Sequence, residues 1–110
     1  MATIMIVDDS IIIRKALKKI LVSLDHEVIA EVSNGREAVE QYALNQADIV
    51  TMDLSMPIMD GINAVKEIVE DYSEARIVMI SAIDQKHLVF EALEAGAKHY
   101  IVKPFDRNIV

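Results

Sequence analysis

Five residues that can bind a metal ion or a phosphoryl group each lie just after a short apolar segment of the chain. In order they are Asp8, Asp9, Asp53, Ser81 and Lys103. If the apolar segments are parallel strands of one sheet, their carboxyl ends lie along the same edge. The five side chains would then converge on one site, although they come from positions spread over most of the sequence.

Three carboxylates in one crevice repel one another unless they take up protons or a cation neutralises them. The five residues offer only oxygen ligands to a metal, because the chain has no cysteine and no histidine is among them. Mg²⁺ suits such an open oxygen site, since it keeps several waters and takes one or two carboxylates together with phosphate oxygens. The residues therefore predict that a magnesium ion neutralises this edge.

The same residues supply the parts that phosphoryl transfer requires, which are a nucleophile and cations that neutralise the phosphoryl oxygens. Asp53 is the expected carboxylate nucleophile, which would form an acyl phosphate while Asp8 and Asp9 hold the metal. Lys103 would pair with one phosphoryl oxygen, and the Ser81 hydroxyl would donate a hydrogen bond to another. The predicted chemistry is phosphorylation of an aspartate.

The elements that position these residues follow from the spacing of apolar residues. Five segments are predicted as strands: 3–7, 27–32, 48–52, 76–80 and 99–102. The segments between them repeat apolar residues at helical spacing, with stripes running from Ile13 to Leu24, Ala38 to Ala43, Ile62 to Tyr72 and Leu88 to Leu93. Gly96 is expected to end the last of these helices.

Strands that alternate with helices through short crossovers must be parallel, with right-handed connections and helices on both faces of the sheet. The predicted fold is a doubly wound α/β sheet of five parallel strands in the order 2-1-3-4-5. This order places the ligand crevice between strands 1 and 3, at their carboxyl ends. A chain of 110 residues has room for one core, so residues 1–110 are expected to form one domain.

Composition excludes several other classes of protein. The formal charge of −7 argues against a nucleic-acid or anionic-membrane surface. No apolar run approaches the roughly 18 residues that a membrane span needs, and the start of the chain has no basic segment typical of a signal peptide. Together with the absence of cysteine, this favours a cytoplasmic location.

Four segments carry a resemblance to a known family. They are Val7-Asp8-Asp9-Ser10, the stretch from Met52 through Asp53 to Gly61, Ser81-Ala82, and Lys103-Pro104-Phe105. In order and spacing they resemble the receiver domain of bacterial two-component response regulators, with a flavodoxin-like fold, and within that family the single-domain chemotaxis regulators. The resemblance implies a signalling switch that catalyses chemistry only on itself and is not an enzyme with a separate substrate.

The family pattern also implies roles for individual residues. Asp53 would accept a phosphoryl group from a histidine of a sensor kinase or phosphotransfer protein. Mg²⁺ would be held by Asp9, Asp53 and the backbone carbonyl of Ser55, with Asp8 assisting. On phosphorylation Ser81 would move toward the phosphoryl group and Tyr100 would swing inward, which changes a partner-binding face formed by the fourth helix and fifth strand.

The sequence departs from the family pattern in three places. Ser81 stands where threonine is commoner, and the apolar Ile83 cannot position an attacking water, so no special acceleration of dephosphorylation is expected from it. Family members continue through a fifth helix of about three turns, whereas this sequence ends at Val110. A truncated fifth helix would leave one flank of the sheet bare, and self-association through that flank is the expected consequence.

The Lys103-Pro104 peptide is expected to be cis, as in the family.

Several alternatives remain open at this stage. The chain is either a stand-alone chemotaxis-type protein or the receiver module of a longer transcription regulator. A flavodoxin-like FMN carrier shares the fold, but the Asp8-Asp9-Ser10 loop would repel the flavin phosphate. An aspartyl-phosphate phosphatase would have its nucleophile after the first strand, with another aspartate two residues later.

A basic helix face is the last feature with two interpretations. It consists of Arg14, Lys15, Lys18 and Lys19. The simpler interpretation is a solvated surface. The functional one is kinase docking, because Ile11 and Ile12 lie beside the acidic pair where family members meet phosphotransfer helices.

Overall fold

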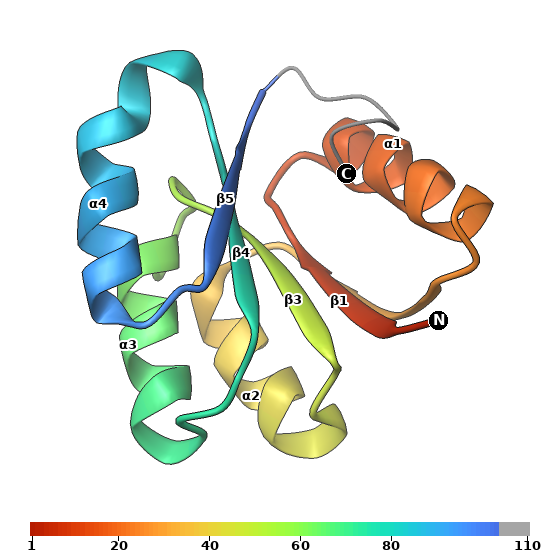
Figure 1. Ribbon diagram of the computed structural model, residues 1–110, viewed down its shortest axis with the longest axis horizontal. Coiled ribbons are helices and arrows are strands. Elements are labelled where there is room, and N and C mark those ends of the chain that lie inside the picture. Colours follow the sequence, from red (N-terminus) through yellow and green to blue (C-terminus); the bar gives the residue numbers. More distant parts are fainter. Residues whose placement is uncertain (104–110) are drawn as a thin grey trace.

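The computed structural model describes residues 1–103, apart from the side chain of Ile83, as an alternation of strands and helices. The strands are β1 (Thr3–Val7), β2 (Glu27–Val32), β3 (Ile49–Asp53), β4 (Ile77–Ser81) and β5 (His99–Val102). The helices are α1 (Ile11–Ser23), α2 (Gly35–Asn45), α3 (Gly61–Asp71), the short 3₁₀ turn η1 (Ile83–Gln85) and α4 (Lys86–Ala95). All strands pair in parallel in the order β2-β1-β3-β4-β5, which confirms the predicted fold (Figure 1).

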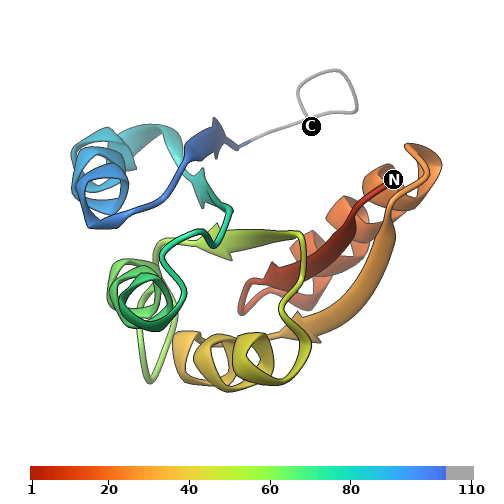
Figure 2. The same ribbon diagram turned by 60° about the horizontal axis from the view of Figure 1, so that its bottom comes forward.

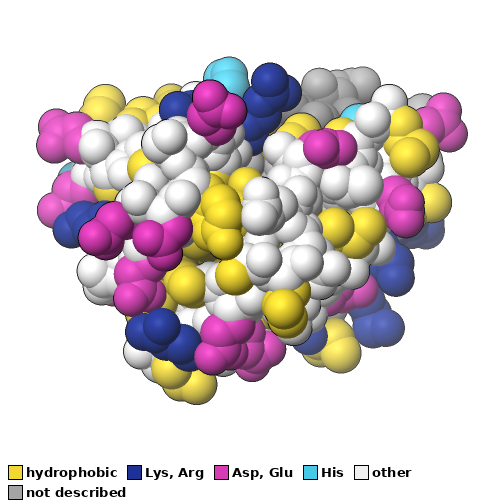
Figure 3. Space-filling model, turned by 90° about the horizontal axis from the view of Figure 1, so that it is seen from below, with side chains coloured by type: hydrophobic (Ala, Val, Ile, Leu, Met, Phe, Trp, Pro, Cys, Tyr) yellow, Lys and Arg dark blue, Asp and Glu magenta, His cyan; other side chains and the backbone are white. Residues whose placement is uncertain are grey.

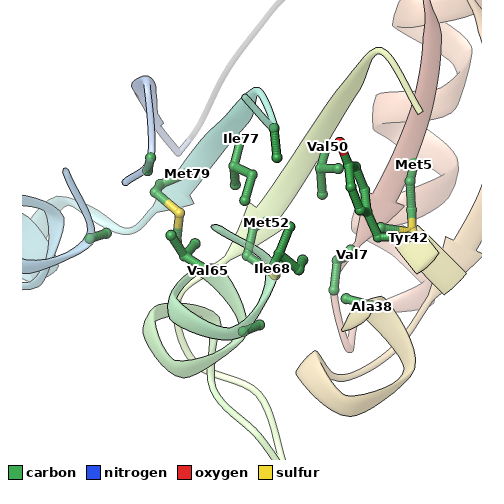
Figure 4. Close-up of a cluster of buried hydrophobic side chains, with 14 of the residues drawn as sticks. Met5, Val7, Ala38, Tyr42, Val50, Met52, Val65, Ile68, Ile77 and Met79 are labelled. Atoms are coloured by element: carbon green, nitrogen blue, oxygen red, sulfur yellow. The ribbon is translucent and has the colours of Figure 1, made fainter. Parts of the chain in front are cut away.

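Helices cover both faces of this sheet. Helices α2, α3 and α4 lie on one face and α1 lies on the other (Figure 2). The larger core lies under the three helices and includes Met5, Val50, Met52, Ile68 and Met79 (Figure 4). On the other face Ile4 and Ile6 of β1 pack against Leu17 and Leu21 of α1. Alternate residues of β1 thus fill opposite cores, as the nearly continuous apolar run predicted.

Polar side chains fix where three helices begin. Each N-cap residue accepts a hydrogen bond from a backbone N–H three residues later; the pairs are Ser10 with Ile13, Asn34 with Glu37 and Asp60 with Asn63. Helix α4 ends at Gly96, whose φ of 128° is rarely adopted by residues with a side chain, and this confirms the predicted end. Since these caps lie close to the strand ends, they also fix the loops that surround the site.

The structure corrects the bounds of two strands. The apolar pattern predicted strands over 48–52 and 76–80, but β3 and β4 each lie one residue later. Asp53 pairs with Ile80, and Ser81 pairs with Val102. Backbone pairing does not depend on the polarity of the side chain, so the ladder extends through the functional residues. Asp53 and Ser81 are therefore the last residues of strands and share the rigidity of the sheet.

Some predictions concern residues outside the described part of the chain. The truncated fifth helix, the Lys103-Pro104 peptide, Phe105 and the self-associating flank all involve residues 104–110, and the role of Ile83 depends on its side chain. Within the described residues, no helix combines the length and the apolar character needed to cross a membrane.

One exposed residue in the loop after β3 has an unfavourable backbone. Ile58 has a φ of 70°, and the N–H of Met59 donates to the carbonyl of Pro57 over 2.7 Å. This is a γ-turn centred on a β-branched residue that is 83% exposed. Because little burial is lost, replacing Ile58 with asparagine should stabilise the protein by about 1 kcal/mol in urea unfolding. Ile58→Val keeps the branched side chain and should give no gain; equal stability of all three proteins would contradict the strain.

Candidate functional site

Three aspartates meet at the carboxyl ends of β1 and β3, which are neighbours in the sheet. One carboxylate oxygen from each of Asp8, Asp9 and Asp53 lies within 4.8 Å of the others. Asp8 is 2% and Asp53 is 6% exposed, whereas Asp9 is on the surface. The site thus has a closed inner side and an open outer side, which suits a metal ion that keeps part of its water shell.

Lys103 places a cation against the two buried carboxylates. Its Nζ lies 3.4 Å from Oδ2 of Asp8 and 3.5 Å from Oδ1 of Asp53. Its backbone N–H donates to the carbonyl of Ser81 over 2.7 Å, so the backbone of Lys103 is held to the end of β4. Three carboxylates and one ammonium leave a formal charge of −2, and a divalent cation would neutralise the site.

The Ser81 hydroxyl is buried at the same edge of the sheet. Ser81 is 0% exposed, and its Oγ has no hydrogen-bond partner among the described residues. A buried hydroxyl without a partner is costly, and such groups in folded proteins are usually satisfied. A phosphoryl group on Asp53 would supply an acceptor on this side of the site, so the residues present fit both a cation and a phosphoryl group.

The environment of Asp53 disfavours its charged form. Burial raises the pKa of this carboxyl to about 6, and the nearby charge of Asp8 adds to the effect. The Lys103 ammonium lowers this pKa, while Asp9 raises it slightly. Because ionisation of Asp53 is disfavoured here, a cation bound beside it would stabilise its charged form.

Hydrogen bonds fix the two buried aspartates. Oδ1 of Asp53 accepts from the N–H of Leu54 over 3.0 Å, and Oδ1 of Asp8 accepts from the N–H of Ser10 over 2.9 Å. Ser10 therefore caps α1 while its backbone holds Asp8, so the helix cap and the site share one turn. This leaves Oδ2 of Asp8 to Lys103.

Arg14 corrects the simpler interpretation of the basic face. Its side chain is only 16% exposed; Nη1 donates to the backbone carbonyl of Asp8, and Nε lies 3.6 Å from Oε1 of Glu31. Lys18 also pairs with Glu31, at 3.5 Å. Arg14 thus supports the loop between β1 and α1, whereas Lys15 and Lys19 are exposed as a solvated face requires. Helical spacing alone could not separate Arg14 from its neighbours.

Two further predicted residues, Ser55 and Tyr100, lie outside the cluster of Asp8, Asp9 and Asp53. Ser55 is exposed in the loop after β3, and its Oγ accepts a hydrogen bond from Nε2 of Gln85 over 2.9 Å. Tyr100 lies outside the cluster, 45% exposed, in a shallow hollow with Lys86, Val89 and Phe90 of α4. Gln85 could not be recognised from the sequence, because an isolated glutamine after a strand carries no pattern of its own.

The opposite edge of the sheet is a poorer candidate. Figure 3 views this amino-terminal edge, where a hollow of about 710 Å³ is lined by residues that include Tyr42, Asp48, Tyr72 and Arg76. Among the described residues, however, the one group of three acidic or histidine side chains close enough to share a metal ion is Asp8, Asp9 and Asp53. The chemistry of the side chains therefore places the candidate site at the carboxyl ends of the strands.

Comparisons with known proteins agree with this geometry. The family model described as the response regulator receiver domain matches residues 4–110. The chemotaxis protein CheY of Bacillus subtilis is 50% identical over 107 residues, which cover 97% of this chain and 89% of that protein. A protein-glutamate methylesterase/protein-glutamine glutaminase of Carboxydothermus hydrogenoformans is 45% identical over 104 residues, which cover 92% of this chain but 29% of that protein.

Solved structures give the same result. A chain in the crystal structure of the CheX-CheY-BeF₃-Mg²⁺ complex from Borrelia burgdorferi matches with a TM-score of 0.92 and 42% identity, covering 96% of this chain and 81% of that one. Receiver domains are signalling switches that bind Mg²⁺ through acidic residues, and they are not conventional enzymes. The match favours this family over the flavodoxin-like alternative. With its CheY-like sequence and its five-stranded fold, the chain belongs to the response regulator receiver domain family.

Proposed function

We propose that this receiver domain is a phosphorylation switch in which Asp53 accepts a phosphoryl group in a Mg²⁺-dependent reaction. The donor would be a histidine of a sensor kinase or phosphotransfer protein. The observation that carries the proposal is the convergence of Asp8, Asp9 and Asp53 within 4.8 Å, with the Lys103 ammonium against two of them. No other group in the described residues combines a buried carboxylate with so many charges.

The transfer is a displacement at phosphorus. Ionised Asp53 attacks through a carboxylate oxygen, the bond from phosphorus to the histidine nitrogen breaks, and the imidazole leaves with that electron pair. Lys103 pairs with a phosphoryl oxygen as the phosphoryl group moves onto the aspartate. The unpartnered Ser81 hydroxyl donates to a second phosphoryl oxygen. Before the reaction, Lys103 has only long contacts with carboxylates, and the Ser81 hydroxyl has no hydrogen-bond partner among the described residues. Each would gain a phosphoryl oxygen as a partner.

The residues that would hold Mg²⁺ are Asp8, Asp9 and Asp53, together with the backbone carbonyl of Ser55. When bound, the ion would neutralise the carboxylates and the phosphoryl oxygens. Mg²⁺ would also lower the pKa of Asp53 from its raised value of about 6, which keeps the nucleophile ionised.

The output would be a change in partner binding at the face of α4 and β5. Phe90 is 67% and Tyr100 is 45% exposed there, and both can contact a protein partner. Movement of Ser81 toward the phosphoryl group and of Tyr100 inward would alter this face. The CheY of the Borrelia burgdorferi structure is in complex with CheX, and a chemotaxis partner is the kind that we propose for this chain. A receiver module within a longer regulator is the alternative, because the methylesterase relative is such a protein.

The proposed donor chemistry can be tested with phosphoimidazole, a small phosphorylated imidazole. Incubation with Mg²⁺ should give a single phosphoryl adduct in the intact-protein mass spectrum, and a chelator should prevent it. Asp9→Asn should raise the Mg²⁺ concentration needed for half-maximal phosphorylation by about tenfold or more, since one anionic ligand is lost. Equal adduct formation with and without the chelator would overturn the metal-dependent mechanism.

A further inference from the structure

The side chain of Gln85 connects two segments that are thirty residues apart. Gln85 ends η1, immediately before α4. Its Oε1 accepts a hydrogen bond from the N–H of Ala82 over 2.9 Å, and its Nε2 donates to Oγ of Ser55 over 2.9 Å. We call this pair of hydrogen bonds the Gln85 bridge. Because a carboxamide is planar, its two ends hold Ala82 and Ser55 at a fixed separation.

The bridge joins the two segments that flank the phosphorylation site. Ser55 follows the nucleophile Asp53 by two residues, and Ala82 directly follows Ser81. Among the described residues, no other side-chain hydrogen bond connects the loop after β3 to residues 82–85. The bridge is therefore the polar contact through which a movement on one side of the site reaches the other.

This arrangement restrains Ser81. Among the described residues the Ser81 hydroxyl has no hydrogen-bond partner, so a phosphoryl group on Asp53 would offer it an acceptor. If the backbone of Ser81 shifts toward that group, Ala82 shifts with it, because the two residues share a peptide bond. The hydrogen bond from Nε2 of Gln85 to Oγ of Ser55 ties residues 82–85 to the loop after β3, so it must break or be displaced before this segment can shift relative to that loop.

We propose that the Gln85 bridge holds residues 81–85 in their resting position and thereby slows phosphorylation of Asp53. Gln85 is a positioning residue in this account, and the inference rests on the proposed function of the site. A phosphoryl group can overcome the bridge, because its charged oxygens accept stronger hydrogen bonds than a neutral carboxamide does. Phosphorylation would thus replace the neutral hydrogen bonds of the Gln85 bridge with hydrogen bonds to charged phosphoryl oxygens.

A double-mutant cycle tests the proposal. The variants are Gln85→Met, which keeps the length of the side chain, Ser55→Ala, which keeps the backbone carbonyl, and their combination. Phosphorylation by acetyl phosphate with Mg²⁺, in which the phosphoryl group moves to Asp53 and acetate leaves, is followed by intact mass. Each single variant should react about fivefold faster than the wild type, as expected for one lost hydrogen bond. The double variant should be no faster than either single variant.

Two further measurements separate positioning from a general structural effect. The side-chain amide signals of Gln85 in the NMR spectrum should move to the position of a free carboxamide in Ser55→Ala, and also in the phosphorylated wild type. Gln46→Met, the same substitution at an exposed position after α2, should leave the rate unchanged.

The outcomes distinguish the bridge from the function on which it depends. A wild-type protein that forms no adduct would overturn both proposals. If the wild type is phosphorylated but neither single variant is faster, or if the two effects multiply in the double variant, the bridge alone is overturned. Slower phosphorylation in both single variants would also overturn it, because the bridge would then support the reacting arrangement.

Discussion

Replacing Gly61 with alanine should destabilise the protein by about 3 kcal/mol and slow phosphorylation on the order of a hundredfold. A Cβ atom at this position would overlap the backbone carbonyl oxygen of Asp53, far inside contact distance. The clash is with backbone, so no side-chain rotation can relieve it. The N–H of Gly61 also donates to the carbonyl of Leu54 over 2.9 Å, which prevents the start of α3 from moving away.

Urea unfolding and acetyl phosphate kinetics measure the two effects of Gly61→Ala. Lys66→Ala is the control, because Lys66 is exposed on the same helix and its truncation should change stability by less than about 0.5 kcal/mol. If Gly61→Ala lost less than about 1 kcal/mol and kept its phosphorylation rate, this would contradict the close contact between α3 and the strand that carries Asp53.

Asp53→Asn should have the opposite effect on stability and raise it by about 2 kcal/mol at neutral pH without metal. The pKa of Asp53 is raised from 3.8 to about 6, chiefly by burial and then by the charge of Asp8. Asparagine has nearly the same shape but never ionises. A shift of two pKa units corresponds to about 3 kcal/mol, which we reduce to about 2 because the site opens to solvent.

The size of this stability gain depends on pH in a defined way. A carboxyl whose pKa is higher in the folded state binds its proton more tightly there, and the bound proton therefore stabilises the folded protein. This stabilisation is fully present below pH 3.8 and is lost as the pH rises through about 6. The advantage of Asp53→Asn should therefore be greatest above about pH 7 and vanish near pH 4. Urea unfolding of both proteins across this range, with a chelator present, measures it. A stability difference that does not change with pH would contradict the raised pKa.

Much of the fold was predictable because the apolar pattern of this chain is strong. The run Ile4-Met5-Ile6-Val7 predicted a strand covered on both faces, and its residues do alternate between two cores. Short crossovers then left few ways to connect the strands, and the order β2-β1-β3-β4-β5 followed. The ends of β3 and β4 were misplaced by one residue, since hydrophobicity does not report the backbone pairing of Asp53 and Ser81.

The convergence of the charged site residues was also predictable, because parallel strands bring their carboxyl ends together. The contacts that hold the site were not. Arg14 looked like its solvated neighbours, and its approach to Asp8 depends on the packing of α1 against β2. Gln85 had no distinguishing spacing, and its bridge depends on the path of two loops. Likewise the γ-turn at Ile58 contradicts the preference of an isoleucine, so only the folded chain reveals it.

If the carboxylate of Asp53 is the phosphoryl acceptor, mapping the phosphorylated residue should identify it. The protein is incubated with acetyl phosphate and Mg²⁺, the acyl phosphate is reduced with borohydride, and the digested peptides are analysed by mass spectrometry. We expect a single modified residue, Asp53, with no modification in Asp53→Asn or with a chelator. Modification at Asp8 or Asp9 instead, or an adduct of equal yield in a folded Asp53→Asn variant, would contradict it.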